Sequence, residues 1–490
     1  MSSQVTISVW LFIILLVVCA WALLERVLIP SSRWFIRRRI NRVIDEISSR
    51  LDIQIKPFQL TKRQVLIDRL VYDPKVLAAV QETAHERECP REIVQQKVMS
   101  YAREIVPSFN AYLYFRIGYW IAKKIARLLY RVRIGIASDE QFSSIDPEST
   151  VVFVMNHRSN MDYVLVAFLA AEKTTLSYAV GEWAKIWPLQ TLIRAMGAFF
   201  VRRNSSDPLY RRVLERYVHM ATKEGVCQAV FLEGGLSRDG CLRPPKLGFL
   251  DYMLRSYDPL KDRDIVFIPV GVNYDRTLED RSLLRELDPD AEKRSRWFVI
   301  KTTCRFIWKS LVLMILSRWQ RFGYACVNFG NPISVRQYCQ DKALDFKKLE
   351  RSARFLEVEN LAGRLMDAIK QVLPALPVSL VATVMLESGQ NGMRAFEVEA
   401  QVNRLIADLQ EDGAHVYVSP LKRVESILNA LNMLVLRRLV RESKGIYSVI
   451  PEEVDVLSYY ANAIAHWRHG CGNGSDALHP KKAFGVNHVA

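Results

Sequence analysis

One stretch, from about residue 139 to about residue 338, constrains the fold most, because short apolar runs alternate there with helical patterns. The runs lie near 151–155, 177–180, 198–201, 228–232, 265–272 and 324–329. Short apolar runs of this kind are typical of buried strands, and their alternation with helices favours a parallel sheet. We therefore predict an α/β fold with a mostly parallel sheet flanked by helices.

The first run leads into a candidate catalytic pair. Residues 151–155 (VVFVM) end at a polar loop that delivers His157, and Asp162 follows five positions later. A carboxylate that fixes one imidazole nitrogen as a donor leaves the other free to take a proton, as a general base for a hydroxyl nucleophile does. Asn160 is placed to cap a helix beginning near Met161. In isolation, the same spacing is a weak signal, because a histidine that ends a strand and an aspartate that caps a helix also produce it.

Two further runs end in residues suited to an anionic ligand. GAFFVRR ends in Arg202 and Arg203, and the planar guanidinium suits bidentate phosphate binding. VFLEGGLSR contains Glu233, which could accept a hydrogen bond from a substrate hydroxyl. A glycine turn follows it, and the backbone amides of this turn could form an anion-binding nest. The candidate nest and its cations are Gly234, Gly235, Ser237, Arg238 and Lys246. Each motif alone is equally consistent with a surface loop.

The run FIPVGV contains Pro269, which indicates an edge strand or a bulge because proline cannot donate to a strand ladder. In parallel sheets, ligands bind beyond the carboxyl ends of the strands. The loops that carry His157, Arg202 and Glu233 should therefore meet at one edge of the sheet.

Charge and hydropathy indicate a membrane. Residues 5–29 are almost continuously apolar and long enough to cross a bilayer, and five arginines between 33 and 42 favour a cytoplasmic location for the bulk of the chain. A buried or interfacial helix is the alternative. The net charge of +16 indicates an anionic partner, and the lack of zinc-finger or RNA-binding signatures disfavours nucleic acid. Eight scattered cysteines without CxxC indicate reduced thiols, and no metal site is predicted.

We predict five parts: a membrane anchor at 1–32, a basic helical region at 33–140, the α/β domain at 141–340, a helical C-terminal domain at 341–468 and a disordered tail at 469–490. The block 112–124 mixes aromatic residues with cations, which suits a membrane surface or an ordinary amphipathic helix. The stretch 297–319 is similar and could lie at the interface, line an acyl groove or pack as a long helix.

Taken together, NHRSNMD, GAFFVRR, FLEGGLSR and FIPV resemble the four blocks of the glycerolipid acyltransferase superfamily, which carries an HxxxxD motif. The GAFFVRR form and the Ser-Arg after EGG resemble its glycerol-3-phosphate acyltransferase branch, and YACVNFGNPI and YYANAIAH look like late landmarks of that branch. The resemblance implies transfer of a fatty acyl chain from acyl-CoA or acyl carrier protein to the sn-1 hydroxyl of glycerol-3-phosphate, the first step of phospholipid synthesis, with no other cofactor.

The resemblance also implies roles for residues. His157 would be the base, oriented by Asp162, and the acyl donor would lie near Phe200 and Pro269. The acceptor phosphate would contact Arg202, Arg203, Arg238 and Lys246. The protein would sit at the inner or plasma membrane, in contact with anionic lipid, with its catalytic domain on the cytoplasmic side.

One departure leaves the acceptor open: Leu236 stands where family members commonly carry arginine or threonine. The alternatives are a lysophosphatidate or dihydroxyacetone-phosphate acyltransferase and, from another class, a non-catalytic membrane lipid-binding protein.

Overall fold

The computed structural model describes residues 56–136, 144–170, 176–181, 189–202, 205–287, 322–389 and 391–468, together with Trp10. Apart from Trp10, the expected membrane anchor lies outside the described residues, as do the stretch 297–319, Arg203 and the expected tail. Among the helices in the described ranges, none is both long and apolar enough to cross a bilayer.

An eight-stranded sheet forms the centre of the molecule, in the order β1-β7-β6-β2-β5-β3-β4, with β8 also paired to β6. The strands are β1 (Arg131–Ile136), β2 (Thr150–Met155), β3 (Ser177–Val180), β4 (Phe199–Phe200), β5 (Gln228–Phe231), β6 (Ile265–Tyr274), β7 (Tyr324–Phe329) and β8 (Ile333–Ser334). Strands β6, β2, β5, β3 and β4 run parallel to one another, whereas β7 and β8 run antiparallel to β6. The predicted α/β fold with a mostly parallel sheet is confirmed.

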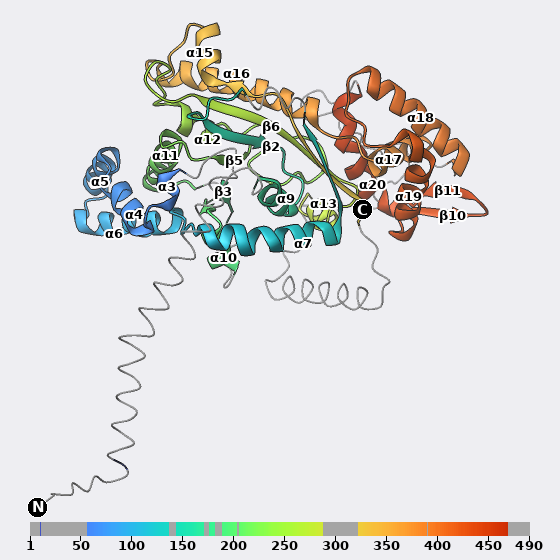
Figure 1. Ribbon diagram of the computed structural model, residues 1–490, viewed down its shortest axis with the longest axis horizontal. Helices are drawn as coiled ribbons and strands as arrows, with labels where there is room; N and C mark the ends of the chain where they lie inside the picture. The colour runs from blue at the N-terminus through green and yellow to red at the C-terminus, as the bar shows by residue number, and fades with distance from the viewer. Residues whose placement is uncertain are drawn as a thin grey trace, which may run out of the picture.

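Helices cover both faces of this sheet (Figure 1). Helices α11 (Pro208–Lys223), α12 (Leu247–Leu254) and α16 (Arg351–Val372) pack on one face, and α7 (Tyr119–Leu129) and α9 (Met161–Ala170) on the other. Val152 and Val154 belong to the first apolar cluster, and Val151, Phe153 and Met155 to the second. Because both faces of the sheet are covered, residues 151–155 of β2 form a continuous apolar run rather than an alternating pattern.

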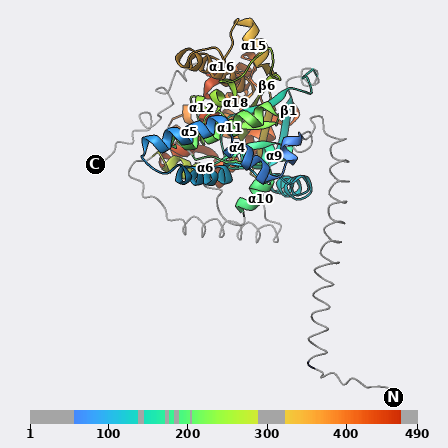
Figure 2. The same ribbon diagram turned by 90° about the vertical axis from the view of Figure 1, so that its left-hand side faces the viewer.

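The N-terminal helices form a group against α11. They are α3 (Pro57–Leu60), α4 (Arg63–Val71), α5 (Pro74–Glu86) and α6 (Arg91–Ile105). Figure 2 looks from their side and shows α5 and α4 close to α11. The Asp73 side chain caps α5 by accepting from the Lys75 amide, and Arg216 of α11 reaches back to the same carboxylate at 2.9 Å. This pair ties the group to the central domain.

Strand β1 differs from the sequence-based expectation, because it lies within the region expected to be helical. Its residues RVRIGI pair in parallel with β7 at the edge of the sheet. Arg131 and Arg133 alternate with Val132 and Ile134, which is the two-residue period of a strand, although Ile134 is itself 49% exposed at this edge.

Pro269 also differs from expectation, because β6 is a central strand with neither an edge position nor a bulge. Its residues pair with β2 through Pro269–Val154 on one side. On the other side of β6, β8 pairs only with Val266 and Phe267, and the residues of β6 that pair with β7 start only at Val270. The Pro269 carbonyl points to that side and accepts from Gly330, so the missing amide hydrogen falls in the interval between β8 and β7.

The C-terminal part has its own apolar core. Its elements are α17 (Pro377–Glu387), β9 (Met393–Arg394), α18 (Ala395–Glu411), α19 (Arg423–Leu436), β10 (Val440–Ser443), β11 (Ile446–Val449), α20 (Val454–Ala461) and the 3-10 helix η6 (Asn462–Trp467). Helix α20 packs against α13 (Asp280–Arg285), which follows β6, so this core adjoins the carboxyl edge of the sheet.

Candidate functional site

The predicted pair is formed. His157 Nδ1 lies 2.8 Å from Asp162 Oδ2, and the two side chains are 1% and 0% exposed. His157 follows the carboxyl end of β2, and Asp162 stands in the first turn of α9. Nε2 of His157 is buried and has no hydrogen-bond partner among the described residues. A buried polar atom without a partner needs an explanation. A general base must keep one nitrogen free to accept a proton from a substrate, and this role would explain the unpaired Nε2.

Both carboxylate oxygens of Asp162 accept hydrogen bonds. Its Oδ2 also accepts from the amides of Arg158 at 2.7 Å and Ser159 at 3.1 Å, and its Oδ1 accepts from the Tyr274 hydroxyl at 2.6 Å. The carboxylate therefore has its orientation defined on both oxygens.

The cap of α9 differs from the prediction. The Ser159 hydroxyl, rather than the Asn160 side chain, accepts from the Met161 amide at 3.1 Å. The Asn160 amide donates to Glu279 at 3.3 Å, and the Ser159 hydroxyl donates to the same carboxylate at 2.7 Å. The partly buried carboxyl group of Glu279 thus lies at the helix N-terminus, where negative charge is favourable.

Glu233 and Ser237 of the third motif form hydrogen bonds with the backbone of His157. Glu233 Oε1 accepts from the His157 amide at 2.8 Å, and the Ser237 amide donates to the His157 carbonyl at 2.8 Å. Glu233 Oε2 accepts from the Arg243 amide at 3.0 Å. Burial raises the pKa of Glu233 to about 7, although these amides act in the opposite direction. The described contacts of Glu233 and Ser237 are thus with the protein itself.

Aromatic rings fix the imidazole plane. Phe231 stacks on it at 3.9 Å between ring centroids, and Tyr163 meets it edge-on at 5.4 Å. Both rings exclude water, which strengthens the interaction between His157 and Asp162.

The predicted phosphate ligands are only partly brought together. Arg202 follows β4, at the same carboxyl edge as His157, but three strand spacings separate β4 from β2, which is about 14 Å. Its guanidinium forms a bidentate pair with Glu104 of α6 at 2.9 and 2.6 Å, which holds the pKa of Arg202 above its ordinary value. The rings of Tyr101 and Tyr210 face the same guanidinium at 5.0 Å.

The cations around the glycine turn are more available. Lys246 is exposed and forms no ion pair with the described residues, and its side chain lies over Gly234. Gly234 has a φ of +65°, and a Cβ there would lie 2.7 Å from Lys246 Cγ. Gly235 is buried. Arg238 is 44% exposed and lies 3.3 Å from Glu286.

The residues predicted near the acyl donor are buried. Phe200 is 0% exposed within the apolar cluster that contains α9, and Pro269 is buried in β6. Leu236, which stands in place of a polar residue, packs against the C-terminal apolar core.

The C-terminal part meets the loop of the first motif through Tyr459 and Arg158, two residues to which the sequence motifs assigned no role. Arg158 is 4% exposed, donates to the carbonyl of Gly240 and lies 5.4 Å from the centroid of the Tyr459 ring. The Tyr459 hydroxyl donates to the Arg158 carbonyl at 3.2 Å. Gly240 has a φ of +87°, and a Cβ there would lie 2.0 Å from the Tyr459 carbonyl oxygen. Only the proximity of Arg158 to His157 in the sequence could have pointed to it.

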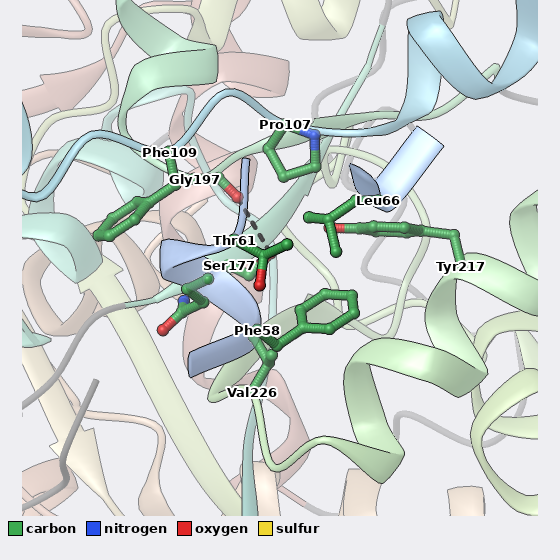
Figure 3. Close-up of a pocket in the computed structure, with 10 residues that line it drawn as sticks. Phe58, Thr61, Leu66, Pro107, Phe109, Ser177, Gly197, Tyr217 and Val226 are labelled. Atoms are coloured by element: carbon green, nitrogen blue, oxygen red, sulfur yellow. Dashed lines mark hydrogen bonds between the residues drawn. The ribbon is translucent and has the colours of Figure 1, made fainter. Parts of the chain in front are cut away.

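A pocket lies elsewhere in the protein (Figure 3). Ser177, Gly197 and Val226, which line it, directly precede or begin β3, β4 and β5, so it opens at the amino ends of these strands. The Ser177 hydroxyl donates to the Gly197 carbonyl there at 3.0 Å. This pocket is therefore at the opposite edge of the sheet from His157.

Two family models match the chain. The acyltransferase model matches residues 136–273, which contain the four motifs up to β6, and the model of the glycerol-3-phosphate acyltransferase C-terminal region matches residues 310–468. A crystal structure of the 1-acyl-sn-glycerophosphate acyltransferase from Thermotoga maritima is 16% identical and covers 52% of this chain and 78% of its own. Its TM-score of 0.29 is too low to carry an argument.

Curated relatives match across both regions. The glycerol-3-phosphate acyltransferase of Shewanella pealeana is 27% identical over 422 residues, and that of Shewanella woodyi 28% over 426 residues. Each alignment covers 83% of this chain and 50% of the relative, so the chain spans about half the length of the curated relatives it matches. Both family models and these alignments agree, so over the residues they cover the chain is similar to the glycerol-3-phosphate acyltransferases.

Proposed function

We propose that this protein transfers a fatty acyl chain from an acyl thioester to the sn-1 hydroxyl of glycerol-3-phosphate. One observation carries the proposal: His157 Nδ1 lies 2.8 Å from Asp162, while Nε2 has no partner among the described residues. The names of the curated relatives support glycerol-3-phosphate as the acceptor. The acyl donor is acyl-CoA or acyl carrier protein.

In the proposed reaction, Nε2 of His157 takes the proton of the acceptor hydroxyl as its oxygen attacks the thioester carbonyl carbon. The new C–O ester bond forms, the C–S bond breaks, and the thiolate leaves and receives the proton from His157. Asp162 stabilises the imidazolium between these two transfers. A correctly placed base contributes typically about 10²–10⁴-fold, and holding two substrates together contributes much of the rest. No covalent acyl-enzyme is required.

The acceptor phosphate would be bound by cations at the carboxyl edge of the sheet. Lys246 and Arg238, on the loop that grips His157, are the best placed of the described candidates. Arg202 would contribute only if its pairing with Glu104 were exchanged for the phosphate. Arg203 stays in the proposal from the sequence motif alone.

The test is an assay of the purified chain with labelled acyl-CoA or acyl carrier protein. Glycerol-3-phosphate, lysophosphatidate and dihydroxyacetone phosphate would be offered as acceptors under the same conditions. We expect acylation of glycerol-3-phosphate, and a loss of about 10³-fold or more in His157→Ala. His219→Ala is the matched control, because His219 is a partly buried histidine on α11.

Three results would overturn the assignment. Preference for another acceptor would make the protein a different acyltransferase. Acyl transfer that survives unchanged in His157→Ala would end the catalytic role of this residue. A purified chain that binds lipid and transfers nothing would support the non-catalytic alternative.

The proposal includes a membrane-facing surface on η2 (Leu113–Gly118) and α7. The surface consists of Ile117, Trp120, Lys124, Ile125 and Leu128, which recur at helical spacing and are all exposed; Trp120 is 58% exposed. No acidic residue occurs between 113 and 129. Exposed apolar side chains among cations favour the interface of an anionic bilayer. Location at the inner or plasma membrane, with the catalytic part on the cytoplasmic side, belongs to the same proposal.

A fluorophore sensitive to polarity tests this surface locally. Placed at position 120, it should shift to the blue with vesicles of phosphatidylglycerol and much less with phosphatidylcholine. Placed at Leu436, which is 70% exposed on α19, it should not shift. Equal responses at the two positions would contradict a specific membrane-facing surface.

A further inference from the structure

We propose that Tyr274 is a positioning residue for the reaction, because its hydroxyl holds Asp162 in the orientation that keeps His157 ready to accept a proton. For its effect on the rate, this inference rests on the proposed acyl transfer. The Tyr274 hydroxyl bonds to Asp162 rather than to His157, so it acts through Asp162.

The contact is short and fully enclosed. The Tyr274 hydroxyl donates to Asp162 Oδ1 at 2.6 Å, and the two residues are 1% and 0% exposed. Tyr274 is the last residue of β6, the strand beside β2, so the sheet brings it to the edge where His157 lies. Burial raises the pKa of the Tyr274 phenol well above its ordinary value, so it stays a donor throughout the pH range of an assay.

The two oxygens of Asp162 are held in different ways. Three donors converge on Oδ2, namely His157 Nδ1 and the amides of Arg158 and Ser159. Oδ1 accepts from the Tyr274 hydroxyl. Rotation about the Cβ–Cγ bond moves both oxygens, and the terminal torsion of aspartate is broad, so donors at one oxygen alone resist this rotation less than donors at both. The second anchor removes that freedom and spreads the negative charge toward the side away from His157.

Tyr274 is itself held in place. Its backbone pairs with Ala325 of β7, and its ring lies 5.2 Å from that of Tyr130, measured between centroids. The Tyr130 hydroxyl donates instead to the carbonyl of Arg276 at 2.8 Å. Tyr130 is therefore an equally buried neighbour that makes a hydrogen bond of its own without touching Asp162.

Several ionisable groups face the pair and must be considered when pH is varied. Glu279 lies beside Asp162 at the start of α9, Arg158 follows His157, and Glu233 accepts from the His157 amide. Burial raises the pKa of Glu233 to about 7, so its titration falls in the same range as that of a histidine base. The pH profiles should be measured in the wild-type and in the Glu233→Gln background.

The experiment compares Tyr274→Phe with Tyr130→Phe in the full chain. Each variant loses one buried hydroxyl, so both unfolding midpoints should fall, and that of Tyr274→Phe should fall further because its hydroxyl donates to a charged group. Only Tyr274→Phe should lose kcat, by roughly ten- to a hundredfold, because misorientation of the imidazole costs more than its stronger pairing with Asp162 gains. KM for the acceptor should stay near the wild-type value in both.

The pH dependence gives a second readout with a defined sign. Without the Tyr274 donor, Asp162 carries more of its charge toward His157 and stabilises the imidazolium more. The acid limb of the profile should therefore move to higher pH in Tyr274→Phe, by about half a unit to one unit. With 3-fluorotyrosine at position 274, a stronger donor of nearly the same shape, the limb should move to lower pH. This second variant also serves if Tyr274→Phe fails to fold.

A measurement without turnover separates this inference from the proposed function. The titration of His157 can be followed by NMR in protein carrying ¹³C-labelled histidine and assigned with His157→Ala. The same upward shift in Tyr274→Phe, and none in Tyr130→Phe, would support the inference even if the chain transferred no acyl group. Equal losses of kcat in the two variants, or an unmoved His157 titration, would overturn it.

Discussion

Asp162→Asn tests the geometry of the site most sharply, because it keeps the side-chain shape and removes the charge. Three donors converge on Oδ2, so the new amide oxygen must lie there and the NH₂ group must take the place of Oδ1. The NH₂ group then faces the Tyr274 hydroxyl, which can turn to accept a hydrogen bond. His157 should therefore keep the proton on Nδ1 and leave Nε2 free, so the productive tautomer survives.

The expected loss then comes from charge alone. An opposite charge at hydrogen-bond distance typically moves a neighbouring titration by about one to three pH units, at about 1.4 kcal/mol each. The imidazolium formed during transfer loses this stabilisation, so kcat should fall about ten- to a thousandfold. The acid limb of the pH profile should move to lower pH, opposite to the shift expected for Tyr274→Phe.

Two measurements check this prediction. The dependence of kcat/KM on pH gives the rate and the acid limb, and ¹⁵N NMR of the histidine ring gives the tautomer of His157. A variant that carries the proton on Nε2 and loses about 10⁴-fold or more, as happens when the tautomer is wrong, would refute the orientation argued from the donors. A variant as fast as the wild type would refute the role of Asp162 altogether.

The remaining predictions concern the loops around the pair. Glu233→Gln leaves one of the amides of His157 and Arg243 facing an NH₂ group, which should lower the free energy of unfolding by about 1–3 kcal/mol in urea titrations. Because burial raises the pKa of Glu233 from 4.5 to about 7, the folded protein keeps a proton that the unfolded chain loses, so wild-type stability should fall as pH rises through this window. The Gln variant should lack this slope; parallel curves would contradict the argument. Lys246→Ala should raise KM for the acceptor about tenfold and leave the unfolding midpoint unchanged. Arg202→Ala should instead destabilise the fold by about 1 kcal/mol, because it breaks the ion pair between Arg202 and Glu104 of α6. The reverse pattern would show that Arg202 binds the acceptor.

Strands β2 to β7 of the central sheet could be predicted because each is mostly buried and therefore appears in the sequence as a short apolar run. The meeting of His157 and Glu233 at one edge followed from parallel pairing alone. Strand β1 was missed because its alternating arginines resemble the basic helical region around it. The position of Pro269 depends on where β8 stops and β7 begins, which no local pattern contains.

The partners of the site residues could be predicted less well, because they come from distant parts of the chain. Glu104, which pairs with Arg202, precedes it by 98 residues, and Tyr274 follows Asp162 by 112. The sequence identified Glu233 by its chemistry and suggested contact with a substrate. In the fold, its carboxylate accepts from two backbone amides. A motif therefore identifies which residues matter more readily than it identifies what they touch.

The packing of α20 on the loop after β5 has a consequence for protein engineering. Gly240 lies so close to the Tyr459 carbonyl that any side chain at 240 would push α20 outward, and Arg158 stands between the two regions. The two family models divide the chain between residues 273 and 310, yet this contact spans the division. Chimeras assembled from two relatives at that boundary should fold well only when both parents have glycine at the position of Gly240 and an aromatic residue at the position of Tyr459.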